Sequence, residues 1–185
     1  QALSPSEVDS TLSLVRGPFA VGLHLADGRA LGAVDRFAIR SLCYRVIQGQ
    51  IHFAERADSL AALHPKAPLD PQALFDYLYF HIIPSPRTAF QGVFRVPAGH
   101  RVSFAGGQTD VRAYWRPHFT EPAHADFGRL AETFRTTVRQ AVERQLDGSK
   151  PACFLSGGTD SSTVAGMIAQ VAGRASTYSI GFDAE

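Results

Sequence analysis

The sequence has few residues of the kinds that mark disulfide-stabilised or membrane-bound proteins. It contains two cysteines, one methionine and one tryptophan among 185 residues. Cys43 and Cys153 both lie in apolar, strand-like runs, where a small buried thiol is the favoured interpretation and a reducing compartment fits. No window approaches the roughly 20 apolar residues of a membrane-spanning helix, and the N-terminal residues lack the basic start and apolar stretch of a secretory signal. We therefore expect a cytoplasmic protein with no membrane partner.

An excess of charge of one sign is also missing. Eighteen basic and seventeen acidic side chains leave a formal net charge of +1, and neither sign forms a long run, so nucleic acid is not expected as a partner. The seven histidines show no spacing typical of metal ligands. Hydrophobic residues make up 45% of the chain, which is enough for a sizeable core. The composition favours an ordinary globular protein.

The region from Thr11 to Ala62 is predicted to be a β meander. Apolar runs alternate there with turn sequences such as Ala26-Asp27-Gly28-Arg29, in which glycine tolerates the positive φ of a hairpin turn. Asp70-Pro71 then predicts a helix start, because the carboxylate caps the helix and proline loses no hydrogen bond at the first helical position. We expect this helix to carry an apolar stripe made of Leu74, Tyr77, Leu78 and His81.

The last third of the chain changes from strand-like to alternating helix and strand patterns. Asp126–Leu146 has apolar residues at steps of three and four, as an amphipathic helix requires. Pro151–Leu155 is almost wholly apolar, which predicts a strand buried on both faces of a parallel sheet. A helix over Asp160–Gly173 and a strand over Ser176–Phe182 follow. This order predicts the start of a doubly wound parallel α/β domain with right-handed crossovers.

The run Ser156–Ser162, Ser-Gly-Gly-Thr-Asp-Ser-Ser, stands at the predicted junction of strand and helix. Ligands bind beyond the carboxyl ends of strands in such sheets, and a helix N-terminus offers unpaired N–H groups. Gly157 and Gly158 would let the backbone approach a phosphate, and the serine hydroxyls would donate further hydrogen bonds. Asp160 beside a phosphate makes sense if Mg²⁺ lies between them.

A simpler interpretation of this run is a turn whose Asp160 merely caps the helix. The full seven-residue run is more specific than such a turn, so we favour a nucleotide-binding loop. A Walker A loop is excluded, because its Gly-Lys-Ser/Thr sequence is absent.

Ser156–Ser162 resembles the Ser-Gly-Gly-x-Asp-Ser-Ser loop of the N-type ATP pyrophosphatases, among which asparagine synthase is the most similar family. Tyr178–Phe182 resembles their next strand, whose backbone reads adenine. Asp35–Tyr44 resembles the Asp-Arg-Phe-Gly-x-x-Pro-Leu-Tyr segment of class II glutamine amidotransferase domains, with Ala38 in place of the glycine and Ser41 in place of the proline. Similarity to the stretch that joins the two domains is found at Pro86–Phe90, Val96–His100 and Tyr114-Trp115.

The resemblance implies three segments and an enzymatic activity. Residues 1–116 would be the C-terminal part of a β-rich, α+β amidotransferase-like domain, 117–125 a linker, and 126–185 the N-terminal part of an α/β ATP-pyrophosphatase domain. Such a ligase adenylates a carboxylate, for example that of aspartate, with release of AMP and pyrophosphate, and transfers ammonia derived from glutamine. Its partners would be these small molecules.

The resemblance also implies which residues bind the cofactors ATP and Mg²⁺. Asp160 would hold the metal, Phe154 and Ile180 would lie against adenine, and the loop would hold pyrophosphate. The complete implied set is Phe154, Leu155, Ser156, Gly157, Gly158, Asp160, Ser161, Ser162 and Ile180. The family's glutaminase uses an N-terminal cysteine activated by its own α-amine. Since the sequence begins with Gln1, no catalytic residue is assigned, and we expect a fragment of a longer enzyme.

Two alternatives stay open at this point. The chain would also fit an amide ligase without glutaminase activity, of the β-lactam synthetase or lasso-peptide cyclase type, that joins its substrate's own amine. A non-catalytic nucleotide-binding protein is the third reading. The sequence leaves a homodimer open.

Overall fold

The computed structural model describes residues 4–121, 124, 126–148 and 150–181. The chain divides into two compact units, residues 1–119 and 120–185. The first combines helices with antiparallel sheets, and the second pairs parallel strands with helices. The predicted fold class, α+β followed by α/β, is confirmed. Within the described residues no helix is both long and apolar enough to cross a bilayer.

The first unit is built from short helices and strands that form two sheets. One sheet has the strand order β1-β2-β6-β7 and the other β4-β3-β5, and all the pairs are antiparallel. The helices are α1 (Pro5–Leu14), α2 (Ala57–Ala61) and α3 (Pro71–Phe80). The strands are β1 (Ala20–His24), β2 (Ala30–Val34), β3 (Cys43–Ile47), β4 (Gln50–Ala54), β5 (Val93–Arg95), β6 (His100–Ala105) and β7 (Gln108–Ala113).

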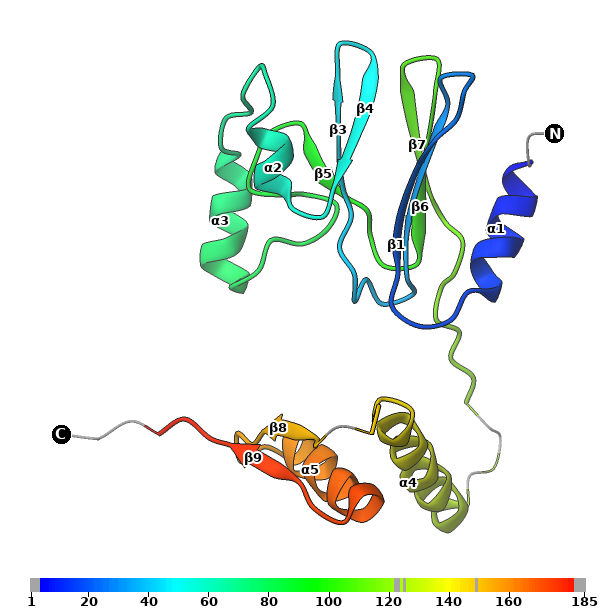
Figure 1. Ribbon diagram of the computed structural model, residues 1–185, viewed down its shortest axis with the longest axis vertical. Coiled ribbons are helices and arrows are strands. Elements are labelled where there is room, and N and C mark those ends of the chain that lie inside the picture. The colour runs from blue at the N-terminus through cyan, green and yellow to red at the C-terminus, as the bar shows by residue number, and fades with distance from the viewer. Residues whose placement is uncertain (1–3, 122–123, 125, 149, 182–185) are drawn as a thin grey trace. The chain divides into compact units, whose positions relative to one another are not determined.

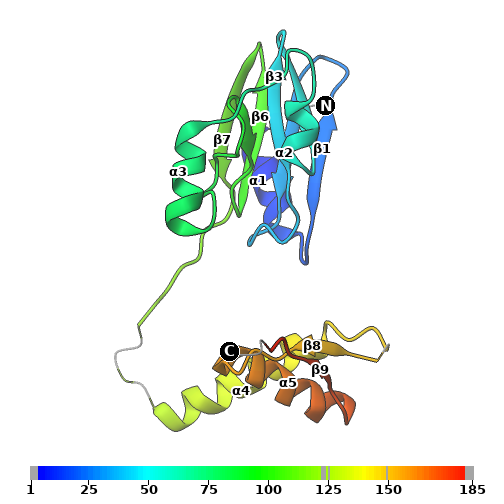
Figure 2. The same cartoon turned by 90° about the vertical axis from the view of Figure 1, so that its left-hand side faces the viewer.

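The two sheets of this unit lie face to face, with α1 beyond one sheet and α2 beyond the other (Figures 1 and 2). Side chains from both sheets make the shared core. Gly32 sits where they approach closely: a Cβ there would come within 2.7 Å of the Phe53 ring. The buried core residues are Ala30, Val34, Leu42, Tyr44, Ile51, Val96, Val102 and Phe104. A smaller cluster under α2 contains Cys43, Leu60, Ala61 and Val93.

The predicted meander over Thr11–Ala62 is wrong, although its hairpins form. The β1–β2 and β3–β4 hairpins belong to different sheets, because β2 pairs with β6 and β3 with β5. The segment Asp35–Leu42 carries the chain from one sheet to the other. Local turn signals predict hairpins but carry no information on such long-range pairing.

Two helices also differ from expectation. The pattern gave no sign of α1, which a capping box between Ser4 and Glu7 begins and which an ion pair between Asp9 and the buried Arg101 of β6 ties to the sheet. Helix α3 forms with Asp70 as its N-cap, as predicted. Its expected apolar stripe is wrong, because Leu74, Tyr77 and Leu78 are exposed, His81 lies outside the helix, and only Ala73 is buried.

The buried carboxylate of Asp35 organises the connection between the two sheets. It accepts backbone N–H bonds from Phe19, Phe37, Ile39 and Arg40 at 3.0 to 3.3 Å. Burial raises the pKa of a carboxyl group, but these four donors outweigh burial and lower the pKa of Asp35 below its ordinary value. The ionised side chain therefore fixes both the crossover and the residue that leads into β1.

We predict that Asp35→Asn lowers the free energy of unfolding by about 2 kcal/mol, because charge-assisted bonds are lost from a buried site. Urea unfolding followed by the fluorescence of the single tryptophan, Trp115, measures this. Asp110→Asn, at an exposed carboxylate paired with Arg112, is the control and should change stability by less than about 0.5 kcal/mol.

The pH dependence of the Asp35 effect has a definite sign. Because the pKa of Asp35 is lower in the folded protein, its ionised form stabilises the fold. This stabilisation is fully present at pH values above the pKa of the unfolded state, about 3.9, and is lost as the pH falls through the pKa of the folded state. The difference between wild type and Asp35→Asn should therefore shrink in acid. A difference that stays constant from pH 7 to below pH 3 would contradict this role.

Ala38, which replaces the glycine of the resembling motif, lies in the left-handed region of backbone conformation with φ 51°. That conformation costs a residue with a Cβ about 1 kcal/mol, whereas glycine adopts it freely. We predict that Ala38→Gly raises the unfolding free energy by about 0.5–1 kcal/mol. Ala105→Gly, in strand β6, should lower it, because glycine weakens an ordinary strand. Stabilities that fall in both variants would show that Ala38 is not strained.

The second unit contains two helices and a pair of parallel strands among its described residues. These are α4 (Phe127–Glu143), β8 (Ala152–Phe154), α5 (Thr159–Ala172) and β9 (Ser176–Tyr178). β8 and β9 pair in parallel, with Phe154 opposite Tyr178. Asp126 caps α4 by accepting the Arg129 N–H. Because parallel strands share a direction, the carboxyl ends of β8 and β9 lie at the same edge.

Candidate nucleotide-binding site

The seven-residue run Ser156–Ser162 lies at the junction of strand and helix, as the sequence predicted: it begins after β8 and ends in the first turn of α5. Gly157 has φ 83°, and no atom lies within 4 Å of a Cβ built there. The N-cap of α5 is Gly158, which offers no side chain to satisfy the first turn. Within the part of the chain that the structure describes, the N–H groups of Thr159, Asp160 and Ser161 donate to no acceptor. The loop thus presents free amide donors to solvent at a helix N-terminus.

Two of the three predicted serines meet inside the loop. The Ser156 and Ser161 hydroxyls are 3.1 Å apart, and the Ser156 N–H donates to Ser161 Oγ at 3.3 Å. Ser161 Oγ donates to the Gly158 carbonyl at 3.1 Å. Ser162 lies one residue further along α5, where its N–H bonds to the same carbonyl. These contacts hold the loop curved, with Ser156 exposed and Ser161 partly buried.

Asp160 stands in the first turn of α5. Its carboxylate forms no hydrogen bond or ion pair with any residue that the structure describes. No cluster of three or more metal-ligating side chains occurs in the described ranges, so a cation here would have one protein carboxylate. That donor set fits Mg²⁺, which is commonly bound through one or two carboxylates together with substrate phosphates and water.

Phe154 and Ile180, predicted to flank adenine, lie on neighbouring segments at this edge. They are 76% and 79% exposed, and Tyr178, the register partner of Phe154, is 61% exposed. The prediction that Pro151–Leu155 is buried on both faces is wrong for the described residues. Cys153 of β8 and Leu155, which follows the strand, are partly buried, whereas Ala152 and Phe154 between and beside them are exposed.

Ser179 was not identified from the sequence, although it lies within the segment Tyr178–Phe182 that resembles the adenine-reading strand. Its hydroxyl donates to the Leu155 carbonyl at 2.7 Å. The Leu155 N–H in turn donates to the Tyr178 carbonyl at 2.9 Å. Both backbone groups of Leu155 are therefore tied to the neighbouring strand at the point where the loop begins.

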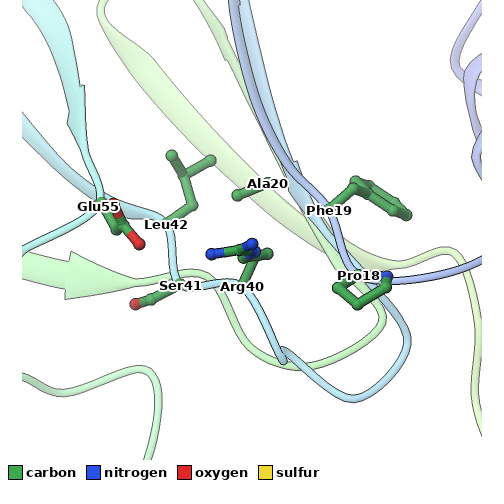
Figure 3. Close-up of a pocket in the computed structure, with 7 residues that line it drawn as sticks. All are labelled: Pro18, Phe19, Ala20, Arg40, Ser41, Leu42 and Glu55. Carbon is green, nitrogen blue, oxygen red and sulfur yellow. The ribbon is translucent and has the colours of Figure 1, made fainter. Parts of the chain in front are cut away.

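The first unit has a cavity of about 450 Å³ at the carboxyl end of β4, beside the start of β1. Figure 3 shows that Arg40 and Glu55 bring opposite charges to this cavity. The rest of its lining consists of Pro18, Phe19, Ala20, Ser41 and Leu42. Neither charged side chain is paired with a residue that the structure describes.

Cys43 does not replace a terminal nucleophile. It is 1% exposed in the middle of the second sheet, and burial raises the pKa of its thiol, which keeps the sulfur in its less reactive protonated form. No residue of the described chain, Cys43 included, is assigned as catalytic.

Comparison with known proteins agrees with both units. Residues 6–115, more than half of the 185-residue chain, match the glutamine amidotransferase domain family. Residues 133–185 match the asparagine synthase family. The first unit is thus a glutamine amidotransferase domain. With its second match and its similarity to a bacterial asparagine synthetase, the chain belongs to the asparagine synthase family, as its motifs predicted.

The individual relatives carry different names. Asparagine synthetase [glutamine-hydrolyzing] 1 of Bacillus subtilis is 28% identical over 95% of this chain and 28% of its own length. Amidase chyE of Penicillium rubens is 34% identical over 88% of this chain and 25% of its own length. Carboxyethyl-arginine beta-lactam-synthase of Streptomyces clavuligerus is 30% identical over 92% of this chain and 31% of its own length. The chain spans less than a third of each relative. Among solved structures, a match is found to glutamine phosphoribosylpyrophosphate amidotransferase from B. subtilis, complexed with ADP and GMP. The match covers 94% of this chain and 34% of that chain, with 11% sequence identity and a TM-score of 0.38.

The conformation of the loop predicts opposite effects of alanine at two glycines. Gly157→Ala should destabilise α5 by about 1 kcal/mol, because a Cβ disfavours its φ of 83°. Gly166→Ala, at an exposed site inside α5 with open space around it, should stabilise the helix by about 0.5–1 kcal/mol. Hydrogen exchange of the α5 amides measures both changes, and equal protection in the two variants would contradict the positive φ.

Proposed function

We propose that this chain is part of an ATP-dependent amide ligase that adenylates a carboxylate, such as that of aspartate, and then transfers ammonia derived from glutamine to it. The observation that carries the proposal is the exposed Ser-Gly-Gly-Thr-Asp-Ser-Ser loop with its unpaired helix N-terminus, in a chain of the asparagine synthase family. The assignment of residues 1–116, 117–125 and 126–185 as amidotransferase part, linker and synthetase part belongs to the same proposal.

Pyrophosphate would lie over Ser156–Ser162. The free N–H groups of the first turn of α5 supply several hydrogen bonds, and the helix dipole adds about 0.3–1 kcal/mol per charge at an exposed site. Gly157 leaves space for the anion, since nothing lies within 4 Å of a Cβ position there. The hydroxyls of Ser156, Ser161 and Ser162 complete this cradle.

Asp160 would hold Mg²⁺ against the phosphates. Its carboxylate has no partner in the described chain, and an unscreened carboxylate would repel the anion. When bound, the cation neutralises charge on the departing pyrophosphate.

Adenine would lie against Phe154 and Ile180. Both side chains are strongly exposed at the carboxyl edge of the parallel strands, where α/β sheets bind their ligands. Leu155, between Phe154 and the loop, would join the base-binding part of the site to the phosphate-binding part.

In the proposed reaction an oxygen of the substrate carboxylate attacks the α-phosphorus of ATP. The bond from that phosphorus to the bridging oxygen breaks, and pyrophosphate leaves. An amine then attacks the activated carbonyl carbon, loses a proton, and expels AMP. Such displacement depends on positioning and on charge stabilisation more than on a covalent protein intermediate, which suits backbone amides and one carboxylate.

An amide ligase that uses its substrate's own amine is the second candidate. The similarity to carboxyethyl-arginine beta-lactam-synthase, 30% identity over 92% of this chain, favours it. Here the adenylation step is the same, but neither glutamine nor ammonia takes part. A non-catalytic nucleotide-binding protein is the third, and it would bind ATP without turnover.

Pyrophosphate release by the protein expressed from its full coding sequence tests the proposal. We expect release from ATP only with a carboxylate substrate, and amide formation when glutamine or ammonium is added. Amide formation without either nitrogen source would identify the second candidate, and tight ATP binding with no pyrophosphate under any condition the third.

We predict that Asp160→Asn lowers the affinity for Mg-ATP at least about tenfold, because the one carboxylate facing the phosphates is lost. Calorimetric titration with and without Mg²⁺ measures this, and the variant should lose the Mg²⁺ dependence. Asp126→Asn is the matched control, since Asp126 also begins a helix and asparagine caps as well as aspartate. Unchanged Mg²⁺ dependence in Asp160→Asn would remove Asp160 from the site.

A further inference from the structure

Beside the loop, where the pairing of β8 and β9 ends, a backbone carbonyl accepts a hydrogen bond from a side chain. In a parallel ladder, a residue bonds through its N–H and its C=O to two residues of the neighbouring strand, which are two apart in sequence. Leu155 follows this rule with its N–H, which donates to the Tyr178 carbonyl at 2.9 Å. Its carbonyl would then accept the N–H of Ile180. It instead accepts the Ser179 hydroxyl at 2.7 Å.

This exchange leaves the Ile180 N–H unused. It donates to no acceptor among the residues that the structure describes, although a ladder continued two residues beyond β9 would have offered it one. A backbone donor with no described partner is thus placed at the carboxyl edge of the sheet, next in sequence to Ser179. Adenine carries acceptor nitrogens on its edge, and a fixed backbone N–H distinguishes such an edge from one with a donor at that position.

We propose that Ser179 is a positioning residue: by occupying the Leu155 carbonyl, its hydroxyl keeps the Ile180 N–H free for the base of the nucleotide. This rests on the proposed function, because it assumes that the loop of this unit binds ATP. Ser179 itself contacts no phosphate. Removal of the Ser179 hydroxyl is therefore expected to weaken binding of the base and to leave binding of the phosphates unchanged.

The test compares AMP with inorganic pyrophosphate, each titrated calorimetrically into the protein expressed from its full coding sequence. In Ser179→Ala the Leu155 carbonyl loses its donor, the Ile180 N–H closes the ladder, and the affinity for AMP falls about tenfold. The affinity for pyrophosphate stays within about twofold, since the loop residues are unchanged. Ser179→Thr retains a hydroxyl and keeps both affinities close to wild type.

Ser176→Ala is the matched control, because Ser176 begins the same strand, is exposed, and its hydroxyl bonds to no described residue. It should bind AMP as wild type does. Equal AMP affinity in Ser179→Ala and wild type would overturn the inference, and so would a parallel loss of AMP and pyrophosphate binding, which would indicate general damage to the loop. A wild-type protein that binds neither compound would overturn the proposed function, and this inference with it.

Discussion

The first unit depends on one buried carboxylate. Asp35 gathers four backbone N–H groups with its side chain, and its own backbone bonds to Phe19 and Gly99. Those contacts join the start of β1, the crossover between the sheets and the approach to β6. Two sheets that share a core must be held in register at the point where the chain passes between them. A charged group can remain there because every donor around it is fixed in place.

The same carboxylate constrains the backbone of the residues that follow Asp35. The loop closes tightly enough to drive Ala38 into a left-handed conformation, and Ser41 stands near the cavity that Arg40 and Glu55 line. The backbone path of this segment is thus set by the carboxylate, which accepts the N–H groups of Phe37, Ile39 and Arg40. The aromatic ring of Phe37 packs against Trp115 at 5.4 Å between centroids, and Arg36 lies over that tryptophan.

The sequence predicted local features far better than long-range ones. Turn signals located the hairpins, and Asp70-Pro71 located α3, because these features depend on neighbouring residues. The assignment of hairpins to separate sheets depends on pairs such as Ala33 with Arg101, which no local pattern specifies. The position of the Ser156–Ser162 loop was predictable from a change in periodicity. The Ser179 contact was not, since a single hydroxyl carries no signal until the register of the two strands is known.

In the second unit, one geometric requirement connects the loop with the exposed apolar side chains. Phosphate needs free amides, which a helix start without a capping side chain provides at Gly158. In the proposed function, the aromatic base would lie against the apolar side chains of Phe154 and Ile180, which are both strongly exposed. Both must lie at the same end of the strands, and parallel pairing is the arrangement that places two successive carboxyl ends together. An antiparallel pair would have put Ile180 at the far end of β8, away from the loop.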